Sequence, residues 1–151
     1  MFMKPSRFSV VIFWLAATIC LIGLAEATYL TVVSLTGGTA VCGGSADCSQ
    51  VLGSKYSKIA GLPLASLGAA AYYTAFSFAV FAAFGRPRAR RGFFAVVLAM
   101  FVVTLWLLFV QAFLLHAFCR YCLFSAALVF FLTGIVLIAP GPRTNELARS
   151  R

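Results

Sequence analysis

Four long runs of apolar residues constrain the fold of this chain more than any other sequence feature. They cover about residues 8–35, 62–84, 92–115 and 118–139. Each run is long enough for a membrane-spanning helix, which needs about 20 residues to cross the hydrocarbon core of a bilayer. The chain is also 63% hydrophobic and only 10% charged, with a mean hydropathy of +1.03, values that soluble globular domains do not reach. We therefore predict a single membrane domain over residues 1–151, built as an all-α bundle of four transmembrane helices.

The start of the first run also has features of a secretory signal peptide. Lys4 and Arg7 precede the apolar residues, and residues 25–27 resemble a cleavage site. However, the apolar run before residue 25 is longer than the hydrophobic region of a usual signal peptide, and it continues over residues 29–35. We therefore predict that the segment remains in the protein as the first membrane helix.

Residues 36–61, between the first two runs, have the composition of a loop outside the bilayer. The segment contains several glycines and serines and two cysteines, Cys42 and Cys48. Residues 47–50 read Asp-Cys-Ser-Gln, which is typical of a helix start with an acidic cap and a glutamine that reaches back to it. We therefore expect a short half-helix over about residues 48–57 within this external loop.

Basic residues are distributed unequally between the segments that separate the apolar runs. The basic turn at residues 85–91 would suggest nucleic-acid binding in a soluble protein, but between two apolar helices it is typical of a cytoplasmic loop. With the N-terminus inside, nine basic residues are cytoplasmic and three are external. The cytoplasmic group is Lys4, Arg7, Arg86, Arg88, Arg90, Arg91, Arg143, Arg149 and Arg151, and the external group is Lys55, Lys58 and Arg120. This positive-inside bias predicts a multi-pass membrane protein with both termini in the cytoplasm, which in a bacterium places it in the inner membrane, and no nucleic-acid partner.

Two pairs of cysteines lie just outside the apolar runs, on the side predicted to be external. Cys119 and Cys122 are three residues apart at the start of the last run, so their thiols share one face of a helical turn. Cys42 and Cys48 lie in the first external loop. Compartments outside the bacterial cytoplasm are oxidising, which makes both pairs candidates for thiol–disulfide exchange. A thiol near a helix start is also more readily ionised, because the helix dipole and the free amides stabilise the thiolate.

The two cysteines of the C-x-x-C pair differ in their expected depth. Cys122 should lie one turn deeper than Cys119, beside the apolar interior in which a hydrophobic electron acceptor such as a quinone dissolves. A dithiol can therefore be oxidised outside, and its two electrons passed to a quinone inside, without charged residues in the bilayer.

Other interpretations of the polar residues remain open at this point. The four cysteines, or three of them with His116, have the chemistry of a tetrahedral zinc site, and the pairs could instead be structural disulfides. Either would make the chain a metal-binding or scaffolding membrane protein. Cys20 lies alone in the first run, where we expect a small buried apolar residue. Glu26 and Gln111 are polar groups in apolar helices and therefore functional candidates, although Glu26 is close enough to the outer end to reach water.

The order of these motifs resembles the bacterial homologues of vitamin K epoxide reductase, over about residues 8–140. The residues that carry the resemblance are Cys42-x5-Cys48-Ser49, then Ser54, then Gly61-Leu62-Pro63, and finally Cys119-Arg-Tyr-Cys122. The resemblance implies a four-helix bundle that binds a quinone, menaquinone or ubiquinone, between its helices and oxidises a thioredoxin-like protein. Some bacterial members carry that protein as a fused domain. We find no such domain in these 151 residues and expect a separate thioredoxin-like or DsbA-like partner.

The resemblance also implies roles for individual residues. Cys119 and Cys122 correspond to the active-site pair, with Cys122 beside the quinone. Cys42 and Cys48 correspond to a shuttle pair, in which Cys42 faces the partner and Cys48 exchanges with Cys119. Ser54 corresponds to a serine that hydrogen-bonds a quinone carbonyl.

Two further comparisons limit what the resemblance implies. The animal enzymes have a tyrosine four residues after the second cysteine of the C-x-x-C pair, where this chain has Ala126. The resemblance therefore supports quinone reduction, and at this position it gives no support for epoxide reduction. A DsbB-type quinone reductase is also a four-helix bundle, but its C-x-x-C pair lies in the first external loop and its spaced pair in the second, the reverse of the order here. We therefore predict a thiol:quinone oxidoreductase that drives disulfide formation.

Overall fold

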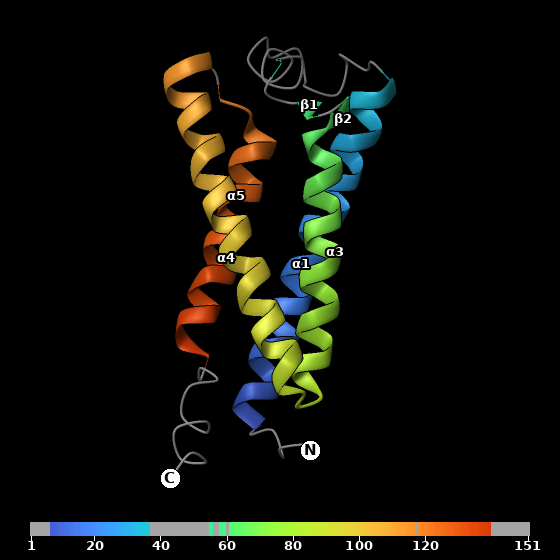
Figure 1. Ribbon diagram of the computed structural model, residues 1–151, viewed down its shortest axis with the longest axis vertical. Coiled ribbons are helices and arrows are strands. Elements are labelled where there is room, and N and C mark those ends of the chain that lie inside the picture. Colours follow the sequence, from blue (N-terminus) through green and yellow to red (C-terminus); the bar gives the residue numbers. More distant parts are fainter. Residues whose placement is uncertain (1–6, 37–54, 56–57, 60, 117, 140–151) are drawn as a thin grey trace.

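Four long helices make up most of the computed structural model, which describes residues 7–36, 55, 58–59, 61–116 and 118–139 (Figure 1). The helices are α1 (Arg7–Thr36), α3 (Leu64–Ala83), α4 (Pro87–Phe109), which the π-helical segment η3 (Val110–Leu115) continues, and α5 (Arg120–Ile138). Each span, with η3 counted as part of α4, is long and apolar enough to cross a membrane. The predicted all-α membrane fold of four helices is therefore confirmed.

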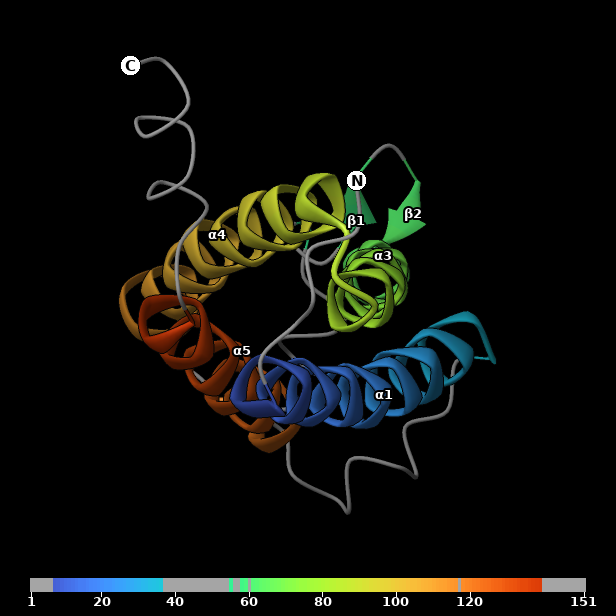
Figure 2. The ribbon, with the colours of Figure 1, turned by 90° about the horizontal axis from the view of Figure 1, so that it is seen from below.

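The helices form a ring in the order α1, α3, α4 and α5, as Figure 2 shows along the bundle axis. The start of α1, the turn between α3 and α4 and the end of α5 lie at one end of the bundle (Figure 1). The end of η3 and the start of α5 lie at the other end, which we call the cysteine end. A short hairpin of β1 (Lys58–Ile59) and β2 (Leu62–Pro63) leads into α3 at the cysteine end, where Gly61 supplies the positive φ of 83° that its tight turn requires.

Small residues bring α1 and α3 together in the most extensive helix contact of the bundle. The buried small residues are Ala16, Ala17, Cys20, Gly23 and Ala27 on α1 and Ala75, Ala79, Ala82 and Ala83 on α3. Between membrane helices the hydrophobic effect is weak, so close approach through small side chains and the resulting van der Waals contacts hold the pair together. The same small residues leave space for Tyr72 of α3, which is only 2% exposed.

Near the α3–α4 turn, aromatic and basic side chains join α4 to α1. Phe13 and Phe93 pack edge to face with their ring centroids 5.8 Å apart. Arg90 lies over the Phe13 ring, 5.3 Å from its centroid, and donates a 2.8 Å hydrogen bond to the Oγ atom of buried Ser9. This end of the ring is therefore closed by side chains, whereas the half nearer the cysteine end contains a cavity.

Two helix starts differ from the sequence prediction. α4 begins at Pro87 instead of residue 92, so most of the predicted loop at residues 85–91 is helical. The reason is local: proline has the fixed φ of a first helical residue and needs no amide partner there. α3 begins at Leu64, because Pro63 pairs in β2 and caps the helix without joining it. The predicted half-helix at residues 48–57 lies outside the described residues except for Lys55.

Candidate functional site

Cys119 and Cys122 occupy the first turn of α5. Cys119 is the N-cap residue, with extended backbone angles of φ −85° and ψ 121°, and α5 begins at Arg120. Both cysteines are free thiols in the structure. Cys119 is fully buried and Cys122 is half-buried. The predicted placement of this pair at a helix start therefore agrees with the structure.

The first turn of α5 stabilises a thiolate at Cys119. A hydrogen bond from the Cys122 thiol contributes most, and the backbone amides of Tyr121 and Cys122 and the charge of Arg120 add to it. These interactions outweigh the burial of the sulfur, which acts in the opposite direction, and lower the pKa of Cys119 to about 6. At neutral pH the thiolate form of Cys119 is therefore favoured.

The thiolate absorbance of reduced Cys119 should accordingly titrate with a midpoint near pH 6, below the pKa of about 8.5 of an ordinary cysteine. The measurement is the ultraviolet absorbance difference between wild-type protein and Cys119→Ser as the pH is varied. In Cys122→Ala the midpoint should rise, because the main hydrogen-bond donor is lost. Because the folded-state pKa is lowered, this thiolate should stabilise the reduced protein above about pH 8.5, an effect lost as the pH falls to 6. A wild-type midpoint at 8.5 or higher would contradict the assignment.

A buried glutamine positions the residue before α5. Gln111 of η3 is 3% exposed, and its Oε1 atom accepts a 3.3 Å hydrogen bond from the backbone N–H of Cys119. The π-helical turn of η3 changes the direction in which its side chains point, and such turns are frequent at functional sites. His116 then adopts a left-handed conformation, with φ 47°, and ends the segment. Gln111 was a functional candidate from sequence, and the structure gives it this positioning contact.

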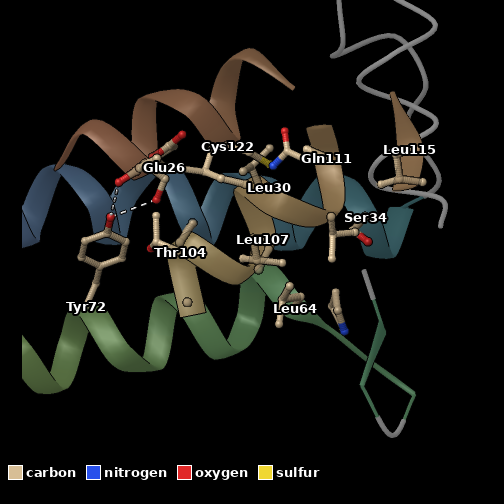
Figure 3. A pocket seen from close by; sticks show the side chains of 18 residues that line it. Glu26, Leu30, Ser34, Leu64, Tyr72, Thr104, Leu107, Gln111, Leu115 and Cys122 are labelled. Carbon is tan, nitrogen blue, oxygen red and sulfur yellow. Dashed lines mark hydrogen bonds between the residues drawn. The ribbon is translucent and has the colours of Figure 1, made fainter. Parts of the chain in front are cut away.

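A cavity of about 150 Å³ lies between the four helices, directly beside Cys122. Most of its lining is apolar, with leucines and alanines from all four spans. The oxygen- and nitrogen-bearing side chains that border it are Glu26, Ser34, Tyr72, Thr104, Gln111 and Ser125. In Figure 3 the side chains of Glu26 from α1 and Cys122 from α5 point into this cavity, with Tyr72 of α3 facing them.

Tyr72 and Ser125 form a polar bridge across the cavity that sequence reasoning missed. The Tyr72 hydroxyl lies 2.9 Å from Ser125 Oγ and 3.2 Å from the Ser125 carbonyl oxygen, to which it donates (Figure 3). A signal was present, since a tyrosine deep within an apolar helix needs a partner for its hydroxyl when it is buried.

The remaining predicted site residues fall into two groups. Cys42, Cys48 and Ser54 lie outside the described residues, so their relation to the cavity stays a prediction. Ala126, which stands where the animal enzymes have tyrosine, lines the cavity and is 5% exposed. The departure from the animal pattern therefore falls on the cavity wall itself.

Comparison with known proteins identifies the family. The model of the vitamin K epoxide reductase family matches residues 14–137, a range that begins in α1, ends in α5 and includes all four spans. The chain belongs to the vitamin K epoxide reductase family. Among curated proteins none matches the chain significantly. Membership in the vitamin K epoxide reductase family implies an oxidoreductase that links disulfide chemistry to a quinone.

The part of the chain that the structure describes gives no support for a zinc site. Residues 7–36, 55, 58–59, 61–116 and 118–139 bring no three histidine, cysteine or acidic side chains together in a way that could hold a metal ion. Cys20, one of the described cysteines, is fully buried in the packed core of α1, as expected for a small apolar residue. Cys42 and Cys48, which the zinc interpretation also uses, are outside these residues.

Proposed function

We propose that the protein is a thiol:quinone oxidoreductase that oxidises a separate thioredoxin-like protein outside the membrane and reduces a membrane quinone. The observation that carries the proposal is the position of Cys122. Its side chain borders an apolar cavity between the four helices, while Cys119, one turn away, is held as a thiolate. A redox-active dithiol and a site for an apolar acceptor are therefore adjacent.

The cavity fits a quinone ring. An apolar protein cavity of roughly 150 Å³ accepts benzene, so the volume suffices for one aromatic ring. The walls are mainly apolar, with a few polar side chains that can hydrogen-bond the carbonyl oxygens of a ubiquinone or menaquinone ring. We propose that Ser54 supplies one such hydrogen bond, by its correspondence to the family serine.

The electron path that we propose joins two disulfide exchanges and one quinone reduction. The partner's dithiol reduces a Cys42–Cys48 disulfide and is itself oxidised. The Cys48 thiolate then attacks Cys119 in the Cys119–Cys122 disulfide and releases Cys122, and Cys42 resolves the mixed disulfide. Finally the Cys119–Cys122 dithiol gives its two electrons to the quinone and returns to the disulfide. Arg120 and the first-turn amides of α5 favour this path, because they stabilise the Cys119 thiolate.

The distribution of charge supports a topology for this path. Four arginines, at positions 86, 88, 90 and 91, surround the α3–α4 turn, whereas the start of α5 has Arg120. We propose that the α3–α4 turn faces the cytoplasm and the cysteine end faces the periplasm or its equivalent, with both termini inside. The cysteines would then work in an oxidising compartment.

Replacing Cys42 should affect a protein electron donor and a small dithiol donor differently. In Cys42→Ser, oxidation of a thioredoxin-like partner should stop, whereas a small dithiol that enters the cavity and reacts at Cys122 should still drive quinone reduction. The measurement compares hydroquinone formation from each donor in wild type and variant. A structural disulfide would behave differently, because its loss would destabilise the loop and lower both activities together. Equal losses with both donors would therefore contradict the shuttle role.

The exchange between the pairs can also be trapped. In the double variant Cys42→Ser/Cys122→Ser neither resolving thiol is present, so a mixed disulfide between Cys48 and Cys119 formed on mild oxidation should persist. A protease site inserted in the turn at residues 84–86 cuts the chain between the two cysteines. On a non-reducing gel the two fragments should stay joined, and Cys48→Ser in the same background is the control in which they should separate. Separation in both would contradict direct exchange.

A further inference from the structure

Glu26 carries the only acidic side chain in the described part of the chain. It lies ten residues before the end of α1 at Thr36, which is roughly 15 Å along the helix axis. Both carboxyl oxygens are buried, and neither makes a hydrogen bond of ordinary geometry, although the Ser125 hydroxyl lies close enough to interact with the carboxyl. The carboxyl therefore does not reach water, although its position near the outer end of α1 would allow it to.

The carboxyl belongs to the same cavity as the redox-active cysteine. Glu26 and Cys122 both line it, from α1 and α5, and Figure 3 shows the two side chains pointing into it. The titratable groups that face Glu26 are Tyr72 on α3, Cys122 on α5 and Cys119 at its cap, while α4 and η3 contribute the non-titrating Thr104 and Gln111.

The other polar groups of the cavity are engaged or cannot carry a proton. The hydroxyls of Tyr72 and Ser125 bond to each other, and the Gln111 oxygen bonds to the Cys119 amide. An alcohol such as Thr104 does not ionise in the physiological range. The carboxyl of Glu26 combines a transferable proton with an unoccupied hydrogen-bonding position that faces the cavity. A protonated carboxyl in such a site donates one hydrogen bond, and a quinone carbonyl accepts one.

We propose that Glu26 is the proton donor to the quinone, giving its carboxyl proton to one quinone oxygen as the Cys119–Cys122 disulfide forms. The inference rests on the proposed thiol:quinone oxidoreductase function and adds to it the group that keeps charge from accumulating in the apolar cavity. A negatively charged reduced quinone would be costly in that environment, so a proton has to arrive with the electrons.

The step balances in electrons and protons. Forming the S–S bond removes two electrons from the two sulfurs, and one proton leaves with them because the pair starts as a Cys119 thiolate and a Cys122 thiol. The quinone needs two electrons and two protons to become a hydroquinone. Glu26 supplies the first proton and takes the Cys122 proton in its place, so its carboxyl ends the turnover as it began. Water at the cysteine end supplies the second proton.

The test compares Glu26→Gln with wild type in quinone reduction by the full chain in detergent, with dithiothreitol as donor and a short-tailed ubiquinone analogue as acceptor. Glutamine keeps the shape and can donate a hydrogen bond, but it cannot release a proton. General acid catalysis contributes roughly 10²–10⁴-fold, so kcat should fall at least a hundredfold while KM stays within about threefold. Glu26→Asp keeps an acid one methylene shorter and should restore part of kcat, with a shifted pH–rate profile.

Two controls distinguish a role of Glu26 in proton transfer from a structural role and from failure of the proposed quinone reduction. Thr28 is exposed on α1, two residues from Glu26, with its hydroxyl bonded to the Leu24 carbonyl, so Thr28→Val should behave as wild type. Unchanged kcat in Glu26→Gln, or a loss confined to KM, would overturn the proton role. A loss of kcat in Glu26→Gln that Glu26→Asp does not restore at any pH would also overturn it. If wild-type protein itself reduces no quinone, the proposed function fails first, whatever the Glu26 variants do.

Discussion

Cys122→Ser should abolish quinone reduction while the four-helix bundle stays folded. The Cys122 side chain borders the cavity, and only a sulfur at this position can form the disulfide with Cys119 that yields two electrons. Serine has nearly the same shape, so the packing around the first turn of α5 should change little. The measurement is hydroquinone formation by purified protein with a small dithiol as donor, which bypasses the loop cysteines. Turnover should fall to the uncatalysed rate.

The matched control is the buried cysteine of α1. Cys20 is fully buried among the small residues of the α1–α3 contact, away from the dithiol. Cys20→Ala removes a thiol from the chain without touching the relay and should keep wild-type turnover. Substantial activity in Cys122→Ser, or an equal loss in Cys20→Ala, would show that the electrons do not pass through the α5 pair.

Gly23→Ala should destabilise the protein and distort the cavity. A Cβ atom at Gly23 would overlap three ring carbons of Tyr72, Cε1, Cζ and Cδ1. Tyr72 cannot yield easily, because its ring is buried and its hydroxyl is bonded to Ser125 across the cavity. Overpacking of this kind costs about 1–3 kcal/mol, and movement of Tyr72 would also break the bond to Ser125. The measurement is the free energy of unfolding in detergent, together with quinone affinity.

Gly134→Ala in α5 is a control that should change the stability of the protein in the opposite direction. A Cβ atom at Gly134 would meet nothing within 4 Å. Replacing a helical glycine by alanine where space allows stabilises a helix by about 0.5–1 kcal/mol. Gly134→Ala should therefore leave the protein as stable as wild type or more stable. Equal stabilities of Gly23→Ala and Gly134→Ala would contradict the close α1–α3 contact at Tyr72.

The four helices could be predicted from sequence because a membrane imposes a minimum length of apolar residues. α4 begins five residues before the predicted start, because proline at position 87 favours the first turn of a helix even though the arginines around it are typical of a loop. The position of the C-x-x-C pair was also predictable, because its spacing and the apolar residues after it define one helical turn. These features depend on neighbours along the chain.

The contacts across the cavity could not be predicted in this way. Tyr72 and Ser125 are 53 residues apart, and their hydrogen bond depends on how α3 and α5 face each other. The same holds for Glu26, whose polarity made it a candidate but whose burial depends on the helices packed around it. Gln111 reaches the Cys119 amide because η3 is π-helical, and no residue pattern indicated that turn.

The Cys119–Cys122 dithiol should deliver its electrons to a quinone in a single turnover, which an anaerobic titration of the reduced protein can measure. The protein would carry Cys20→Ala, Cys42→Ser and Cys48→Ser, so that Cys119 and Cys122 are its only thiols. After reduction and removal of the reductant, it would be titrated with quinone in the absence of oxygen, and its thiols mapped by mass spectrometry. We expect one hydroquinone per chain and a disulfide between Cys119 and Cys122. Absence of hydroquinone, or hydroquinone formed while both thiols can still be alkylated, would contradict it.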